Sequence, residues 1–416
     1  MKSGVIVGRG SEGVVRVIDE TTVVKCCRQS TDGFHIGVFG ESSILAQYRH
    51  PNLMTPVGEH PFAFSDLDFT IQLPYYRRSL ANYQPTDIVS FAYEMLSALA
   101  FLHRNRIIHT DVKPNNIMFD DEGSAHLIDY GQSVRDYGQE KSLEVQASMW
   151  RAPEIILQNT HYTTAIDIWS LGVILHNLIC PKGSSLNNGG GNWYVMWQYC
   201  RRLPYTTPQA PRERLLFSRI MNAPEAAGCE VAKLELPDSC PLELQELVRR
   251  CLTFNYQTRI SAIEALNLPL FNSYTHVIGE VLPFHRGQPV GKDVWKYFEQ
   301  VFKYLRTLPC EAQVLSAELY SSVLVRQPGE PGNLALACAY IAAQQLGTCD
   351  LSQDGFFAER SCPWEQLSTA VREVTAQLRY FLHPLLPPVD IAREYHECEM
   401  SEERQLLYRA ERFSEL

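Results

Sequence analysis

The chain has 416 residues and a formal net charge of -10, with 37 Lys and Arg against 47 Asp and Glu. At roughly 150 residues per domain, this length allows two or three compact units. Hydrophobic residues at 45% and charged residues at 20% are typical of globular proteins, which excludes a collagen-like chain, a coiled-coil rod and extensive disorder. Because the negative charge opposes non-specific attraction to nucleic acid or anionic lipid, we expect neither as a partner.

The 12 cysteines are spread along the chain without a C-x-x-C pair, so reduced thiols are favoured over a disulfide framework or a zinc site. The N-terminus shows no apolar stretch that ends in a secretory cleavage site. The most continuous apolar stretch, residues 334–343, is about half as long as a bilayer-spanning helix. These features predict an intracellular protein without a membrane span, in the cytoplasm or nucleus, or in those of a host cell if the chain is virus-encoded.

The first part of the chain alternates short β-branched runs with glycines. Runs at residues 5–7, 14–18 and 23–24 predict a hairpin followed by a third strand. Residues 41–48 have helix-forming composition, and a helix there must end before Pro51, because proline disfavours helical geometry in the residue that precedes it. These patterns predict a small antiparallel sheet that one helix interrupts.

Beyond this sheet the pattern becomes mostly helical. A strand is expected at residues 69–73, and apolar residues recur at helical spacing over residues 87–103. Glycines and asparagines at residues 184–192 predict a surface loop. The turn-rich stretch 276–290 predicts a linker to a separate C-terminal unit.

Three glycines open the predicted sheet. Gly8, Gly10 and Gly13 form the pattern G-x-G-x-x-G-x-V with Val15, and residues without a side chain let backbone amides approach phosphate oxygens. The pattern alone fits an ordinary glycine-rich hairpin equally well. A dinucleotide-binding βαβ unit is disfavoured, because no helix is expected after the third glycine.

Charged residues at defined positions follow the glycines. Lys25 ends the third strand and Glu41 begins the helix, where an ion pair between them would orient Lys25 toward phosphates. Residues 109–116 read H-T-D-V-K-P-N-N, which places an acid, a base and an amide on one loop. Asp129 follows an apolar strand and precedes a turn, so the strand presents its carboxylate to a metal. Either charge of the first pair, taken alone, would be an ordinary surface residue.

Further motifs complete the series in order. Ala152-Pro153-Glu154 comes first, then D-I-W-S-L-G beginning at Asp167, and finally Arg259, which we expect to pair with Glu154. In this order the motifs resemble those of the eukaryotic protein kinase superfamily, across roughly residues 4–275.

The resemblance implies an α+β fold of two lobes with ATP in the cleft between them. A small antiparallel β lobe with one helix would comprise residues 1–76, and a large, mostly helical lobe residues 77–275. The reaction would be phosphorylation of protein substrates with Mg²⁺. Lys113 two residues after Asp111, followed by proline, resembles serine/threonine kinases, so Ser and Thr hydroxyls are the expected acceptors.

The resemblance also assigns catalytic roles by position. Asp111 would be the base that accepts or steers the substrate hydroxyl proton, and Lys113 would steady the γ-phosphate. Lys25 would contact the α and β phosphates while Glu41 holds Lys25 in place.

Two binding sets follow from the same resemblance. Asn116 and Asp129 would ligate magnesium. In the hinge, Pro74 would offer its carbonyl to adenine and Tyr76 its amide, with Leu73 at the back of the pocket. The expected nucleotide-contacting residues are Gly8, Gly10, Gly13, Val15, Val23, Lys25, Leu73, Pro74, Tyr76 and Met118. For the apolar members a plain core role is an equally natural interpretation.

Two positions depart from the kinase pattern. Thr110 replaces the arginine that normally precedes the catalytic Asp in kinases activated by loop phosphorylation, which predicts that such phosphorylation is dispensable. Ala147 stands where many kinases have a threonine that contacts the catalytic Asp and Lys, which predicts reduced efficiency. The alternative to an active kinase is a pseudokinase scaffold that binds partners through the same fold.

The segments 149–157, 162–169 and 193–208 resemble the cyclin-dependent and MAP kinase branch. In that branch the counterpart of Arg151 helps to shape a pocket for a proline after the phosphoacceptor. Proline-directed specificity is therefore expected.

The C-terminal region, residues 291–416, is predicted to be all-α. Its helices are expected at residues 294–308, 312–325, 334–346 and 364–382. Their succession resembles a cyclin box, which implies an activator tethered to its own kinase that would press on the helix bearing Glu41. Gln344 stands where the cyclin lysine is expected, with Glu373 as its acidic partner. The alternative is an unrelated helical extension that buttresses the kinase.

Overall fold

The computed structural model of the chain describes residues 5–9, 13–28, 41, 44, 45, 47–58, 61–64, 68–136, 140–180, 185–187, 189–222, 234, 236–275 and 277–282. The predicted helices of the C-terminal region, with Gln344 and Glu373, lie outside these residues, as does Gly10.

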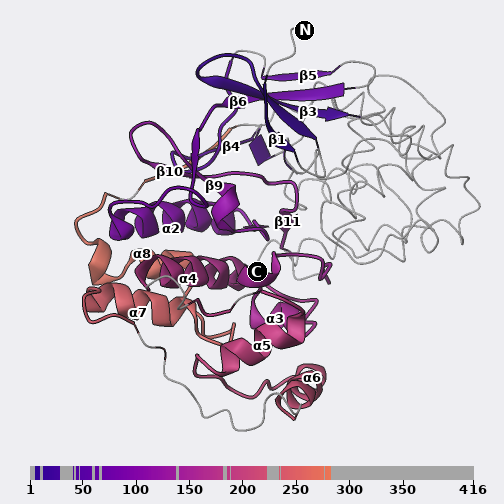
Figure 1. Cartoon of the computed structure of the whole chain (residues 1–416), viewed down its shortest axis with the longest axis vertical. Coiled ribbons are helices and arrows are strands. Elements are labelled where there is room, and N and C mark those ends of the chain that lie inside the picture. The colour runs from indigo at the N-terminus through magenta and orange to yellow at the C-terminus, as the bar shows by residue number, and fades with distance from the viewer. Residues whose placement is uncertain are drawn as a thin grey trace, which may run out of the picture.

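A five-stranded antiparallel sheet contains the first strands of the chain (Figure 1). Its strands, in spatial order, are β1 (Ile6–Arg9), β2 (Val14–Val17), β3 (Thr22–Arg28), β6 (Asp68–Pro74) and β5 (Phe62–Phe64). The hairpin and the third strand expected from the sequence are confirmed. The strand expected at residues 69–73 is confirmed as β6, one residue longer at each end. The sequence pattern did not predict β5.

The register of the sheet determines which side chains face the rest of the molecule. Val23 and Cys27 on β3 are buried, and Lys25 lies between them on the same face, because side chains two residues apart in a strand share a face. Across the ladder, Lys25 lies opposite Ile71 and Val23 opposite Leu73, both of which are also buried. The strand thus directs one ammonium group toward the core side of the sheet.

Helices make up most of the remaining fold (Figure 1). They are α2 (Ile88–Arg104), α3 (Pro153–Ile156), α4 (Ala165–Ile179), α5 (Asn192–Cys200), α6 (Pro211–Met221), α7 (Leu242–Cys251) and α8 (Ala262–Leu266). The helix expected at residues 87–103 is confirmed as α2; Asp87 is its N-cap and accepts hydrogen bonds from the amides of Val89 and Ser90 at 2.8 and 3.0 Å. Helix α4 is buried along most of its length and packs on α2 and α7.

Short strands lie between the five-stranded sheet and the helices (Figure 1). They are β4 (Tyr48–Arg49) paired with β12 (Glu280–Val281), β8 (Ile107–Ile108) paired with β11 (Val134–Arg135), and the three-stranded group β7 (Arg78–Ser79), β9 (Ile117–Phe119) and β10 (Ala125–Leu127). Three 3₁₀ turns, η1 (Pro114–Asn116), η2 (Ser148–Trp150) and η4 (Pro269–Phe271), complete the described elements. Residues 109–116 run between β8 and β9, so short ladders fix both ends of this loop.

Three sequence expectations need correction or completion. The helix expected to reach Tyr48 ends at Gln47, because Tyr48 joins the ladder between β4 and β12. The expected surface loop at 184–192 contains buried Leu186 and Asn187, and Asn187 donates to the carbonyl of Met149 at 2.8 Å. The stretch 276–290, expected to be a linker, contains β12, and its role as a linker stays a prediction.

Six cysteines fall within the described residues, and all six are free thiols: Cys26, Cys27, Cys180, Cys200, Cys240 and Cys251. Within the same part of the chain, every helix is too short or too polar to cross a membrane.

Candidate active site

The ion pair expected between Lys25 and Glu41 is formed. Lys25 Nζ lies 2.5 Å from Glu41 Oε2 and 3.8 Å from Asp129 Oδ1. The Glu41 side chain is only 4% exposed, whereas that of Asp129 is 41% exposed. The ammonium group of Lys25, on the sheet, therefore lies close to both Glu41, on the helix that follows, and Asp129, two residues after β10.

The loop of residues 109–116 brings two of the expected site residues, Lys113 and Asn116, to the carboxylate of a third, Asp111. Lys113 Nζ lies 2.5 Å from Asp111 Oδ2. The side-chain amide of Asn116 donates to the same oxygen and to the backbone carbonyl of Asp111, both at 2.9 Å. Asp111 and Asn116 are buried, so these contacts hold the carboxylate in a fixed orientation.

Asp167, on the first turn of α4, holds the backbone at the start of this loop. Its carboxylate accepts the backbone amides of His109 at 2.8 Å and Thr110 at 2.9 Å, and it lies 2.9 Å from His103 Nε2. Thr110 has φ +66°, a left-handed conformation that residues with a side chain rarely adopt. The sequence pattern identified Asp167 only as part of a motif and did not predict that it binds this loop. A carboxylate in an otherwise apolar, buried helix needs hydrogen-bond partners, and this was the signal for its role.

Thr110 also connects the loop to the segment after Asp129. Its hydroxyl donates to the carbonyl of Gln132 at 2.7 Å. Farther along, Lys141 forms an ion pair of 2.9 Å with Asp136 and is almost completely buried. Two contacts therefore hold the described start of this segment, the hydrogen bond from Thr110 to Gln132 and the ion pair between Asp136 and Lys141.

The two residues expected to bind magnesium flank adjacent strands: Asn116 ends η1 just before β9, and Asp129 lies two residues after β10. The amide of Ile128 donates to the carbonyl of Asn116 at 2.9 Å, which ties the backbones on which Asn116 and Asp129 stand. Because the side-chain NH₂ of Asn116 points at Asp111, its oxygen remains as a ligand atom. A partly exposed carboxylate and an amide oxygen suit Mg²⁺, which usually takes few protein ligands and completes its shell with phosphates and water. The described residues contain no cluster of three or more His, Cys, Asp and Glu ligands.

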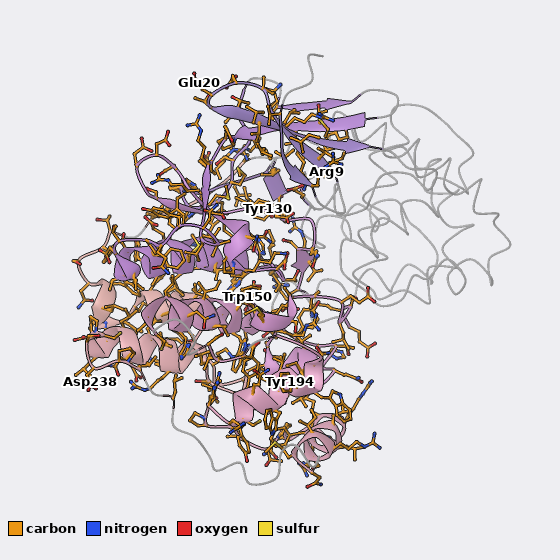
Figure 2. The ribbon with its side chains drawn as sticks, viewed as in Figure 1. Arg9, Glu20, Tyr130, Trp150, Tyr194 and Asp238 are labelled. Atoms are coloured by element: carbon orange, nitrogen blue, oxygen red, sulfur yellow. The ribbon has the colours of Figure 1, made fainter. Side chains whose placement is uncertain are left out.

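Tyr130, the residue after Asp129, lies between the sheet and the helices (Figure 2). Its side chain is buried, and its hydroxyl donates to the carbonyl of Leu127 at 2.9 Å. Burial raises the pKa of the Tyr130 hydroxyl well above its usual value, so it stays a neutral donor. Asp129 itself has φ +67°, a left-handed conformation that residues with a side chain rarely adopt.

The expected hinge residues lie at the end of β6. Leu73 is buried, Pro74 pairs with Thr22 on β3, and Tyr76 stacks on His126 with ring centroids 4.6 Å apart. Burial raises the pKa of Tyr76 to about 12.

The apolar members of the expected nucleotide set lie on two sheets. Val15 and Val23 belong to adjacent strands of the five-stranded sheet, and Met118 lies on β9. Val23 is buried, while the other two are half-buried. Gly8 lies opposite Val15 in the ladder. Gly13 must lack a side chain, because a Cβ there would come within 2.4 Å of the carbonyl oxygen of Cys26.

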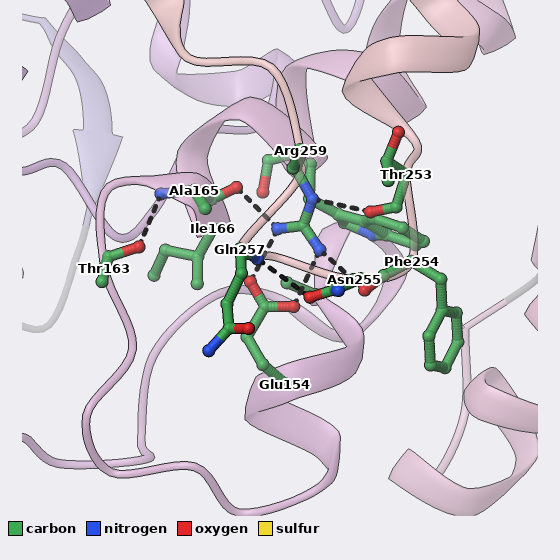
Figure 3. Close-up of polar contacts among 12 residues, drawn as sticks. Glu154, Thr163, Ala165, Ile166, Thr253, Phe254, Asn255, Gln257 and Arg259 are labelled. Atoms are coloured by element: carbon green, nitrogen blue, oxygen red, sulfur yellow. Dashed lines mark hydrogen bonds and ion pairs between the residues drawn. The ribbon is translucent and has the colours of Figure 1, made fainter. Parts of the chain in front are cut away.

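The expected structural pair between Glu154 and Arg259 is confirmed (Figure 3). The guanidinium binds both carboxylate oxygens, at 2.6 and 2.9 Å, and both side chains are buried. Arg259 also donates to the carbonyls of Ala165 and Thr253, at 2.7 and 3.0 Å. A bidentate pair with its remaining donors satisfied fixes α3 against the start of α4.

Comparison with known protein families matches residues 1–271 to the protein kinase domain. The match ends before residues 291–416, so it leaves the cyclin-like interpretation of that region a prediction. A curated relative, "Cell division control protein 2 homolog 3" of Trypanosoma brucei brucei, is 29% identical over 286 residues, which cover 64% of this chain and 90% of that protein. With the geometry described above, these similarities show that the chain belongs to the eukaryotic protein kinase family.

Proposed function

We propose that this chain transfers the γ-phosphoryl group of ATP to Ser and Thr hydroxyls of protein substrates, preferentially where proline follows the acceptor. The observation that best supports this is the fixed carboxylate of Asp111, with Lys113 and Asn116 both bound to its Oδ2. A carboxylate held in this way is ready to orient a hydroxyl and to take its proton.

Each charged group then has one task in the transfer. Asp111 receives the proton of the attacking hydroxyl, and Lys113 places a positive charge beside the phosphoryl group in transit. Lys25, held by Glu41, contacts the phosphates that remain with the nucleotide. Magnesium held by Asn116 and Asp129 would neutralise phosphate charge.

The adenine end is assigned to the hinge. Pro74 has no N–H and offers only its carbonyl, and its neighbour Tyr75 already donates its own amide to Thr21 at 2.7 Å. The amide of Tyr76 is therefore the donor we assign to adenine. Val15, Val23 and Met118 would pack against the base, with Leu73 behind it.

The preference for proline rests on the backbone of Gln146. This residue has φ +58°, and its carbonyl accepts hydrogen bonds from Arg151 Nη2 at 2.6 Å and Nε at 3.2 Å. A carbonyl already bound to a guanidinium is a poor acceptor for the amide of the substrate residue after the phosphoacceptor. An unpaired buried amide is costly, whereas proline has none to satisfy.

The test is the Asp111→Asn variant, assayed with radiolabelled ATP and peptides that contain Ser-Pro or Thr-Pro. Phosphorylation should fall by at least about 10²-fold, the usual contribution of a general base, while binding of a fluorescent ATP analogue persists. Equal phosphorylation by the variant and the unmodified chain would contradict the assignment. Binding without any turnover in the unmodified chain would favour the pseudokinase scaffold.

A second proposal concerns activation in cis by the C-terminal region. Strand β12 pairs with β4, with Glu280 opposite Arg49, and the amide of Leu282 donates to the carbonyl of Gln47 at 2.8 Å. Gln47 is the last helical residue of the segment that bears Glu41. Residue 282 therefore lies beside the helix that positions Lys25, and a domain attached after this residue would act there at high effective concentration.

The β4–β12 pair is also connected to the segment after Asp129. The hydroxyl of Tyr48, on β4, accepts a hydrogen bond from Arg135 Nη2 at 3.0 Å. The ring of Tyr48 lies edge-on to Phe101 of α2, and a Cβ on Gly279 would clash with that same Phe101 ring at 2.4 Å. The contact of Gly279 with Phe101 and the backbone pairing of residues 280–282 with residues 47–49 support an activating role for the C-terminal region.

A further inference from the structure

We propose that the side chain of Gln146 is a positioning residue that sets the preference for proline after the phosphoacceptor. Its amide would hold the backbone conformation in which the Gln146 carbonyl stays bound to Arg151. This inference rests on the proposed proline-directed kinase function and assigns part of it to one side chain.

The side chain of Gln146 is fully engaged and nearly inaccessible, with 4% of the residue exposed. Its amide nitrogen donates to the carbonyl of Ile166 at 2.9 Å and to the hydroxyl of Ser170 at 2.8 Å, both on α4. Its amide oxygen accepts from the backbone N–H of Ala152 at 2.9 Å. These three bonds join α4 to the residue that caps α3.

The backbone of Gln146 is equally constrained. Its N–H donates to the carbonyl of Thr110 at 3.0 Å, and its carbonyl accepts from Arg151. A left-handed φ is unfavourable for a residue with a side chain and persists only where the surroundings impose it. The three side-chain bonds to α3 and α4 supply that constraint.

This arrangement also links the substrate segment to the catalytic loop. Ala147 has no hydroxyl with which to reach Asp111 or Lys113, whereas Gln146 bonds directly to Thr110, the neighbour of Asp111. The backbone hydrogen bond from Gln146 to Thr110 therefore connects the segment that selects the substrate to the loop that holds Asp111. A change in this side chain should alter substrate selection more than nucleotide binding.

The decisive variant is Gln146→Gly in the full chain. Glycine keeps the left-handed backbone accessible but removes all three side-chain bonds, so the carbonyl is no longer restricted to Arg151 and can accept a substrate amide. We would measure kcat/KM for two peptides that differ only in Pro or Ala after the phosphoacceptor. The Pro-to-Ala ratio should fall about tenfold, the factor expected for one hydrogen bond, while KM for ATP changes less than about twofold.

Gln158→Gly is the matched control. Gln158 also has a left-handed backbone, with φ +60°, but it is exposed, and its side chain accepts from Arg212 at 3.0 Å. The same substitution relieves the same backbone strain there without touching the substrate segment. Its Pro-to-Ala ratio should equal that of the unmodified chain.

Ser170→Ala provides a second variant, since it removes one acceptor of the Gln146 amide and leaves the other two bonds. Its ratio should fall by a smaller factor, and thermal unfolding would define a temperature at which every variant is folded. If Gln146→Gly does not fold, Ser170→Ala decides by itself. An unchanged ratio in whichever of these variants fold would overturn the inference, as would an equal fall in Gln158→Gly.

Failure of the underlying function has a different signature. If the unmodified chain phosphorylates both peptides equally well, the proline-directed assignment is wrong, whatever the variants do. If it prefers proline but the folded Gln146→Gly variant retains that preference, only the role of the glutamine side chain is wrong.

Discussion

Lys25 Nζ lies 2.5 Å from Oε2 of Glu41, in an ion pair that joins strand β3 to the helix that follows it. The side chains are 12% and 4% exposed, so solvent screens the pair only weakly. Because Asp129 Oδ1 also lies near the ammonium group, at 3.8 Å, Glu41 keeps Lys25 from pairing with Asp129 alone.

Glu41→Gln should therefore lower kcat/KM for ATP by about 10²-fold, because misplacing a phosphate-binding group by an ångström has about that effect. Removing the negative charge lets Lys25 move toward Asp129 and compete with magnesium for its carboxylate. Steady-state kinetics at varied ATP and Mg²⁺ would check this, and added Mg²⁺ should restore part of the loss. Glu20→Gln, the same change at an exposed residue, should leave both kinetic constants unaltered; an equal loss in both variants would contradict the assignment.

The Glu154–Arg259 pair makes a prediction about stability. Arg259→Met should reduce the free energy of unfolding by about 3–5 kcal/mol, because it leaves a buried carboxylate without its partner. Urea denaturation would measure the loss. Arg212→Met, at an exposed arginine of α6, should change stability by less than about 0.5 kcal/mol. A loss below about 1 kcal/mol for Arg259→Met would mean that the pair matters little to the fold.

Local motifs account for most of what the sequence predicted at the site. Lys113 and Asn116 lie on the same loop as Asp111, so their spacing along the chain nearly fixes their spacing in the structure. Lys25 and Glu41 are farther apart, yet a strand and a helix of regular geometry bring them together. These contacts follow from short stretches of chain whose conformation is set locally.

Other contacts depend on long-range packing and were not predictable from pattern. The partners of Gln146 come from the catalytic loop and from two helices, and a buried glutamine has no periodic signal. Strands β4 and β12 are two residues each, too short for alternation to be recognised, and they pair across most of the described chain. The motif alone did not reveal the role of Asp167, which is to accept the backbone amides of His109 and Thr110.

Two truncations would test activation in cis. Ending the chain after residue 282 keeps β12 but removes everything that follows, and ending it after residue 275 removes β12 as well. We expect the first to lower kcat and the second to lower it further, by about tenfold in total, because the helix bearing Glu41 loses its restraint in two steps. The midpoint of thermal unfolding should fall only slightly in the first truncation. Unchanged activity of that first truncation would remove the activator proposal.

His50 predicts a pH dependence of stability. The ring is buried and stacks on Phe101, its Nδ1 accepts the amide of Asn52 at 3.1 Å, and its Nε2 lies 3.1 Å from Ser97 Oγ. Burial lowers the pKa of His50 to about 4, from 6.5 in the unfolded chain. Between these values the unfolded state binds more protons than the folded state, so stability is lost as pH falls from 6.5 toward about 4, by up to about 3 kcal/mol.

Urea unfolding at a series of pH values would measure this loss. His50→Gln removes the titrating ring, so it should be less stable than the unmodified chain at neutral pH but should lose less stability on acidification. The exposed His161 offers the matched control, since His161→Gln should leave the slope of stability against pH unchanged. A slope that is equally steep in His50→Gln would show that other groups, such as paired carboxylates, dominate the acid response, because a neutral glutamine cannot take up the proton.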